Sequence, residues 1–134
     1  MRLTINDRAF NVASVEDAQS HWETVRGQQF SDVWLDAGES GPSLCMLVNV
    51  GRAFLLYLRD HEGDTGYSSR NPDYAGPPDA VMVFELANGQ RDEYPMSWTI
   101  PLEDAIAACA YFIATQGGRS GDTMWHDDAV AGER

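Results

Sequence analysis

Two almost continuous apolar runs in the middle of the chain place the strongest limit on its fold. They are Leu44–Val48 and Ala53–Leu58, joined by the short connection Asn49–Arg52. A strand with one face in water alternates apolar and polar side chains, whereas unbroken apolar runs suit strands that are covered on both faces or lie in the middle of a sheet. We therefore expect these two segments to be neighbouring strands and to form the core.

Further strands are expected before these runs. Leu3–Ile5 and Ala9–Val12 flank Asn6-Asp7, a pair that favours a tight turn, and so predict a short hairpin. Asp32–Asp36 predicts another strand, in which odd-numbered and even-numbered side chains lie on opposite faces.

The first helix is expected between the hairpin and this strand. Ser14 and Asp17 have the spacing of a capping box, in which side chains satisfy the unpaired amides at a helix start. Apolar residues then recur at helical spacing, which predicts a helix over about Val15–Arg26. Gly27 is expected to close it in the left-handed conformation.

The last third of the chain predicts a hairpin that continues the sheet. Val81–Leu86 and Gln90–Tyr94 flank Asn88-Gly89, a strong hairpin signal. With a two-residue loop, Glu85 and Asp92 lie directly opposite one another on one face. Like charges in this geometry destabilise a sheet by several tenths of a kcal/mol, on the order of other cross-strand pair energies. Either an arginine of this chain or a bulge that changes the register relieves the contact, or the pair forms an acidic patch for a partner.

A second helix follows this hairpin. It is expected to begin near Pro101, whose missing amide is tolerated in a first turn, and to run to Gln116. Gly117-Gly118 is expected to end it. Six apolar residues form one stripe that should cover a face of the sheet: Leu102, Ala105, Ile106, Cys109, Phe112 and Ile113.

These elements predict an α+β fold with a mainly antiparallel sheet and two main helices packed against it. A chain of 134 residues has the size of one domain, which we expect to span residues 1–128. Residues 129–134 are expected to form a disordered tail.

The long connection Asp60–Asp79 is rich in acidic, glycine, serine and proline residues, and connections of this length are commonly functional or mobile. Asp60, Glu62 and Asp64 have the first spacings of a calcium loop. However, glycine is not at the sixth position, and Asn71 replaces the closing glutamate. The sequence also contains no HExxH, CxxC or paired Cys/His spacing, so we expect no metal, no cofactor and no catalytic centre.

The charge of the chain narrows the possible partners. The formal net charge is -12, from 21 acidic and 9 basic residues. Phosphates would be repelled by such a surface, so nucleic acid and anionic membranes are not expected partners, whereas a cationic protein is. No segment has the length of a signal peptide or a membrane span, and we expect the protein in the cytoplasm.

Trp34 lies between Asp32 and Asp36 on the same predicted face of a strand. An aromatic ring flanked by carboxylates can stack on the guanidinium of a partner's arginine while the acids pair with it. The alternative is that Trp34 packs beneath the first helix, because tryptophan is usually well buried. The sequence leaves both open.

The order of motifs over roughly residues 44–128 resembles a known family. The motifs are an apolar hairpin (Leu44–Leu58), Gly63, Gly66-Tyr67, Val81–Tyr94, Ile100-Pro101, Ala105, Ala108, Tyr111-Phe112, Thr115, Gly117 and Trp125. Together they resemble the first-numbered immunity-protein family, Imm1, of bacterial polymorphic toxin systems.

The resemblance implies a small α+β protein that neutralises a co-encoded toxin, often a nucleic-acid deaminase. It implies a one-to-one complex in which the immunity protein keeps the nucleic-acid substrate out, and the acidic charge fits a cationic toxin domain. No family motif marks an interface, so the expected partner-binding residues follow from charge and position. They are Trp34, Asp60, Glu62, Asp64, Tyr67, Glu85, Asp92 and Glu93.

Two other functional classes stay open. One is a small ligand-binding domain or enzyme with a pocket on the sheet face, lined by His61, Tyr67, Tyr94 and Asp92. The other is an adaptor for a protein unrelated to toxins. A neighbouring gene that ends in a short cationic toxin-like domain would favour immunity, and a metabolic operon would count against it.

Overall fold

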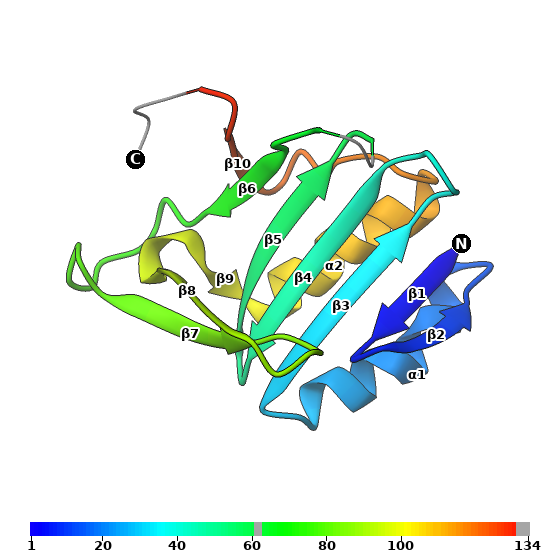
Figure 1. Cartoon of the computed structure of the whole chain (residues 1–134), viewed down its shortest axis with the longest axis horizontal. Coiled ribbons are helices and arrows are strands. Elements are labelled where there is room, and N and C mark those ends of the chain that lie inside the picture. Colours follow the sequence, from blue (N-terminus) through cyan, green and yellow to red (C-terminus); the bar gives the residue numbers. More distant parts are fainter. Residues whose placement is uncertain (61–62, 131–134) are drawn as a thin grey trace.

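An antiparallel sheet forms the centre of the molecule, and both α-helices lie on one side of it (Figure 1). The computed structural model describes residues 1–60 and 63–130. The sheet runs in the order β10-β6-β5-β4-β3-β1-β2, with β9 paired to β5. The α+β fold class expected from the sequence is confirmed. Its strands are β1 (Arg2–Ile5), β2 (Arg8–Asn11), β3 (Phe30–Asp36), β4 (Ser43–Asn49), β5 (Arg52–Leu58), β6 (Tyr67–Arg70), β9 (Ile100–Pro101) and β10 (Met124–Asp127).

The two apolar runs are neighbouring strands near the middle of this sheet, as expected. β4 and β5 pair over their whole length, with Met46 opposite Leu55 and Leu47 opposite Phe54. Because side chains alternate across the sheet, Met46 and Leu55 pack against the helices, while Leu47 and Phe54 belong to a second core on the other face. Each run therefore fills two cores at once.

The first helix is α1 (Val15–Arg26), with the predicted bounds. Ser14 Oγ accepts a hydrogen bond from the amide of Asp17 at 3.2 Å, and Asp17 Oδ2 accepts one from the amide of Ala13 at 2.9 Å. The first bond is half of the expected capping box, while the return bond from Asp17 reaches the amide of Ala13 instead of that of Ser14. The expectation for Gly27 is wrong, since its φ of -85° lies in the right-handed region.

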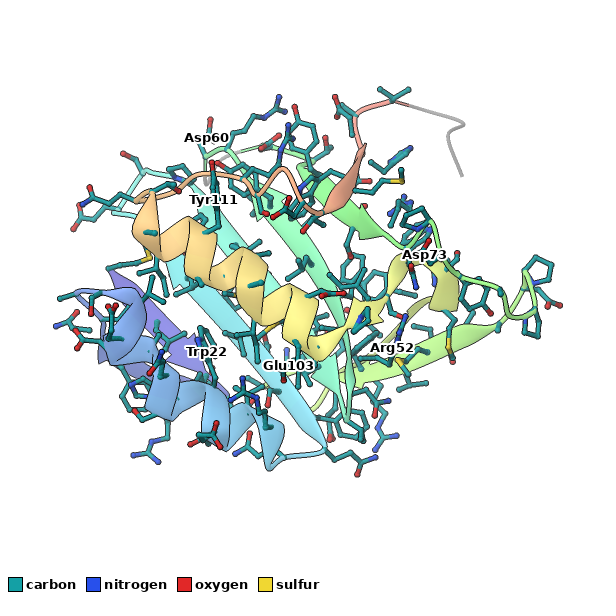
Figure 2. The ribbon with its side chains drawn as sticks, turned by 180° about the vertical axis from the view of Figure 1, so that it is seen from behind. Trp22, Arg52, Asp60, Asp73, Glu103 and Tyr111 are labelled. Atoms are coloured by element: carbon teal, nitrogen blue, oxygen red, sulfur yellow. The ribbon has the colours of Figure 1, made fainter. Side chains whose placement is uncertain are left out.

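The second helix, α2 (Leu102–Ala114), begins directly after Pro101 and is shorter than expected. All six residues of its predicted apolar stripe are buried. The helix ends at Ala114, two residues before the predicted end, and Gln116 and Gly117 then turn the chain away from the helix axis with φ of 55° and 117°. Figure 2 shows α2 crossing the back of the sheet beside α1.

The hairpin of β7 (Val81–Glu85) and β8 (Arg91–Pro95) does not continue the main sheet. It forms a separate two-stranded sheet that packs on the second core through Phe84, which is fully buried. The 3-10 helix η1 (Met96–Trp98) leads from it towards β9.

The predicted register of this hairpin is wrong by one residue. Glu85 lies opposite Arg91, and Asp92 lies opposite Phe84. The amide of Leu86 bonds to the carbonyl of Gln90 at 2.8 Å, so the loop holds three residues instead of two. A shift of one residue moves a side chain to the other face, and the expected contact between Glu85 and Asp92 does not exist. Of the alternatives left open by the sequence, a changed register is the one observed.

Three short strands were not predicted, one of which is β9, paired with β5. β6 lies inside the long connection Asp60–Asp79, and β10 follows α2 and pairs with β6 at the edge of the sheet. In β10, the indole of Trp125 donates to the carbonyl of Ser120 at 2.8 Å. Residues 131–134 of the expected disordered tail lie outside the described residues. Among the helices of the described ranges, none is long and apolar enough to cross a membrane.

Candidate partner-binding surface

The face of the main sheet opposite the helices is covered at one end by the β7–β8 hairpin (Figure 1). Asn49, at the end of β4, donates from Nδ2 to the carbonyl of Val83 at 2.8 Å. Tyr94 stacks on Phe54, with ring centroids 4.1 Å apart and planes 11° from parallel. These contacts fix the hairpin over one end of β3–β5 only.

The other end of this face has no described helix or strand in front of it (Figure 1). We call it the open sheet face. In register across the strands, Thr4 pairs with Trp34 and Trp34 with Cys45, and Cys45 pairs with Leu56. Asp36 and Leu58 pair with Ser43 in the next row that points to this side. The open sheet face is therefore formed by Arg2, Thr4, Trp34, Asp36, Leu56 and Leu58.

Trp34 packs on this face and not beneath α1. The neighbouring residues Val33 and Leu35 point to the helices and are fully buried, while Trp34 is partly buried against the second core. The suggestion that Trp34 packs beneath the first helix is thus wrong. Its partial exposure, with that of Leu56 and Leu58, leaves apolar surface where an antiparallel sheet usually presents polar side chains.

Carboxylates surround Trp34. Asp36 Oδ1 accepts from Ser43 Oγ at 2.6 Å, and Asp32 Oδ2 accepts from the amide of Ala87 at 3.0 Å. Asp32 Oδ1 is buried and has no hydrogen-bond partner among the described residues. Burial raises the pKa of the Cys45 thiol well above its usual value, and the negative charges of Asp32 and Asp36 raise it further.

Asp92 approaches the same region from the hairpin. It lies on the inner side of β8, opposite Phe84, and accepts from Gln90 Nε2 at 2.8 Å. Burial raises the pKa of the Tyr94 hydroxyl, and the charge of Asp92 and its hydrogen bond add to this effect together with the nearby Cys45. Asp92 therefore lies on the inner side of the hairpin, near Tyr94.

The outer side of the hairpin carries Glu85 and Glu93. Glu85 faces Arg91 across the two strands, whereas Glu93 is exposed opposite Val83. The guanidinium of Arg91 also lies 5.6 Å from the ring centre of Phe30. Of these two glutamates, Glu93 is thus the more accessible to a partner.

Asp64 is occupied by a contact within the protein. It pairs with Arg59 at 2.6 Å and accepts from the amides of Arg59 and Gly66, and only 7% of its side chain is exposed. The hydrogen bonds from Arg59 lower the pKa of Asp64 far below its usual value. This carboxylate anchors the turn after β5 and is not available to a partner.

Tyr67 lies on the helix side of the sheet. The guanidinium carbon of Arg119 lies 3.7 Å from the centre of the Tyr67 ring, and that of Arg59 lies 5.0 Å from it. The Tyr67 side chain packs against the core that contains Tyr57. Asp60 is exposed beyond the end of β5, and Glu62 lies outside the described residues. The predicted site residues therefore do not converge: Trp34, Asp92 and the outer hairpin share one side, and Asp64 and Tyr67 belong to another part.

The residues proposed for a ligand pocket do not meet either. Tyr67 packs in the helix-side core and Tyr94 in the hairpin-side core, so the sheet lies between them. Asp92 is on the side of Tyr94, and His61 lies outside the described residues. Within the described ranges, no group of three His, Cys, Asp or Glu side chains could hold a metal ion.

Sequence reasoning missed Leu56 and Leu58 as surface residues. Both lie in an apolar run that was assigned to the core, and nothing in the run indicates that the hairpin covers only one end of it. The alternation of side chains in β5 places them on the same face as Trp34, which was a usable signal once both faces were considered separately.

A comparison with protein families found a match to the model described as Immunity protein Imm1, over residues 5–127. A search of curated proteins found no match. The family match runs from the end of β1 to the end of β10, so it also includes residues 5–43, which precede the motifs of the sequence resemblance. Because it spans the main sheet, the hairpin and both helices, the chain belongs to the Imm1 family of immunity proteins.

Proposed function

We propose that this immunity protein binds one cationic toxin domain, one to one, and covers the basic face with which the toxin binds nucleic acid. The toxin is proposed to be a nucleic-acid deaminase, and the complex to form in the cytoplasm, where such a substrate is found. Inhibition needs no catalysis by the immunity protein, because occupying the substrate face is sufficient.

The distribution of charge carries this proposal. The net charge is -12, and several of the nine arginines are already held by the protein's own acids. Arg26 pairs with Glu23 and Glu103, and Arg59 pairs with Asp64. These pairs neutralise arginines that could otherwise oppose a cationic partner, and they leave a large surplus of carboxylates.

Carboxylates of this surplus lie on the side of the hairpin and the open sheet face. Asp36 and Glu93 are placed there by β3 and β8, and Asp92 lies on the inner side of the hairpin. A toxin that binds nucleic acid needs cationic side chains where the phosphates lie, and carboxylates can occupy the same positions. Such complementarity acts mainly on the association rate and on the choice of partner.

Co-expression tests the function directly. The toxin domain encoded beside this gene is expressed in bacteria with and without the immunity protein, and growth and co-purification are measured. Growth should be restored, and the two chains should elute together in equal amounts. If the toxin still kills and does not co-purify, the proposed function is wrong.

A charge reversal tests the electrostatic part. Glu93→Lys should reduce the association rate by about threefold, because Glu93 is exposed and has no charged residue opposite it. Asp73→Lys is the matched control, since Asp73 is exposed in the connection between β6 and β7 and lies on another side (Figure 2). Equal effects of both variants would show that charge steers the partner without favouring the hairpin side.

A further inference from the structure

The open sheet face holds apolar surface that the fold leaves without a cover. The outward side chains of β4 and β5 include Leu47 and Phe54, which the hairpin covers through Phe84 and Tyr94. Leu56 and Leu58 continue the same face of β5 but extend beyond the hairpin. Antiparallel sheets with one face in water usually present polar side chains there, so the apolar residues indicate a surface that is buried in a complex.

Trp34 is the largest side chain of this surface and lies between two carboxylates. Asp32 and Asp36 are its neighbours on the same face of β3. An indole face surrounded by negative charge attracts a planar cation, and arginine can stack on the ring while its N–H groups pair with carboxylates. Tryptophan is also enriched among the residues that dominate interface energies.

The carboxylate oxygens have capacity for such a partner. Asp36 offers the oxygens that a partner can reach, because its hydrogen bond comes from the neutral hydroxyl of Ser43. Asp32 Oδ1 is buried without a hydrogen-bond partner in the described ranges, and Oδ2 accepts from the amide of Ala87, so Asp32 acts on a partner through its charge. Arg2 lies opposite Asp36 in the register of β1 and β3, yet no ion pair joins them in the described structure. A cation from outside therefore finds in Asp36 a carboxylate that no ion pair of the described structure neutralises.

We propose that the open sheet face is the toxin-contact surface and that Trp34 stacks on an arginine of the toxin, with Asp36 pairing with the guanidinium and the charge of Asp32 adding to the attraction. This rests on the proposed function, since the partner is the cationic toxin domain. Leu56 and Leu58 provide the apolar contact beside the arginine, and the outer side of the hairpin forms the acidic rim.

A groove beside α2 is the main competing surface. It has a volume of about 850 Å³ and lies on the helix side, with Tyr111, Asp73 and Arg52 among its lining residues (Figure 2). Asp104 and Asp122 add negative charge, but Arg52 and a second arginine, Arg70, line the same groove. Two arginines thus oppose a cationic partner in the groove, whereas Arg2 is the arginine that the register places beside Asp36 on the open sheet face.

Binding measurements on variants distinguish the two surfaces. The probe is the catalytically inactive toxin domain encoded beside this gene, and affinity is measured by calorimetry. Trp34→Ala should weaken binding by about 30-fold or more, as for a central tryptophan in an interface. Tyr111→Ala removes an exposed aromatic ring beside the competing groove and should change affinity by less than about twofold. The reverse pattern would overturn the proposal.

Two milder variants separate ring stacking from packing and from loss of fold. Trp34→Phe keeps an aromatic face, whereas Trp34→Leu keeps an apolar side chain without one. If arginine stacks on the ring, the Trp34→Leu variant should bind the toxin roughly threefold or more weakly than the Trp34→Phe variant, which is the range of a cation–π contact. Equal affinities for the two variants would contradict the stacking, provided that thermal unfolding shows both to be folded.

A peptide experiment tests the arginine site without the toxin, and therefore independently of the proposed function. The indole N–H resonances are followed by NMR while a tetra-arginine peptide is added, and a tetra-lysine peptide is the chemical control. The resonance of Trp34 should shift more with arginine, and that of Trp22, which is only 3% exposed, should not shift. An unchanged Trp34 resonance overturns the arginine site. Failure of the wild-type protein to bind the toxin, with a shifted Trp34 resonance, would reject only the toxin as partner.

Discussion

Asp64 shows how a single carboxylate stabilises the turn after β5. The hydrogen bonds from Arg59 lower its pKa in the folded protein below the ordinary value near 3.9. Ionised Asp64 therefore contributes stability that is complete above about pH 5 and is lost as the pH falls through the folded-state pKa. We expect Asp64→Asn to lower the thermal midpoint by a few degrees at pH 7.

The pH dependence of this difference checks the cause. Thermal midpoints of the wild type and of Asp64→Asn are compared from pH 8 down to pH 2. The gap should stay constant above about pH 5 and narrow below pH 4, because the wild-type carboxyl group also becomes neutral. A gap that is independent of pH would mean that packing, and not the charge of Asp64, stabilises the turn.

The two cysteines provide a second test at the level of residues. Cys45 and Cys109 are free and buried, and burial raises the pKa of Cys109 to about 12. At pH 8 only about one Cys109 thiol in ten thousand is then ionised, so the native protein should react very slowly with a disulfide reagent.

Trp34→Ala should expose Cys45 and increase its labelling rate, and bound toxin should restore protection. Rapid labelling of the folded wild type would contradict the observed burial.

The face on which a side chain lies was predictable where it depends on a single strand. The alternation in Asp32–Asp36 correctly placed Trp34 on the same face as both aspartates, since this needs only the period of a strand. The pairing of Asp64 with Arg59 and the stacking of Arg119 on Tyr67 were missed. They depend on a turn and on a loop after α2, which bring together residues that no local pattern relates.

The hairpin is the element whose packing decides which part of the sheet stays open. Phe84 is fully buried in the smaller core between the hairpin and the sheet, whereas Phe112 is fully buried between α2 and the sheet. Phe84→Ala should lower the free energy of unfolding by about 3–5 kcal/mol. The hairpin should be the part of the structure that is destabilised most. Hydrogen exchange should then quicken in β7 and β8 while α2 remains protected.

Phe112→Ala is the matched comparison for this prediction. The same side chain is removed from the larger core, so exchange should quicken throughout β4, β5 and α2. If Phe84→Ala also quickens exchange in α2, the two cores unfold as one unit. The hairpin would then not be a separable cover.

At the scale of elements, the helices and the long strands were predicted well and the hairpin register was not. Periodicity is repeated over a whole helix, whereas the register depends on one residue in a loop. Ala87 belongs to the loop because Asp32 accepts its amide hydrogen and Leu86 closes the pair with Gln90. This contact comes from another strand, so Asn88-Gly89 alone could not reveal it.

For the molecule as a whole, the unbroken apolar runs correctly predicted covered strands near the centre of a sheet. They could not predict how much of each face is covered, because coverage depends on where the hairpin docks. β10 was missed for a related reason: Met124–Asp127 is short and gains its strand partner only when β6 reaches it after a long connection. Long-range pairing of this kind leaves little trace in local sequence.

The net charge of the molecule leads to the last prediction. A charge of -12 should speed the encounter with a cationic toxin, and salt should screen this attraction. Between about 50 and 500 mM NaCl we expect the association rate to fall by about tenfold or more, and the dissociation rate to change by less than about threefold. Stopped-flow fluorescence with the toxin domain measures both rates.

A charge swap distinguishes the total charge from its local arrangement. Glu85→Arg combined with Arg91→Glu exchanges the two residues of a facing pair, so the net charge and the favourable cross-strand contact are both kept. If the field of the whole molecule steers the partner, the swapped protein should associate at the wild-type rate and show the same salt dependence. A slower rate with unchanged salt dependence would show that the pair itself contacts the toxin. An association rate independent of salt in the wild type would contradict electrostatic steering altogether, because screening acts on every exposed charge.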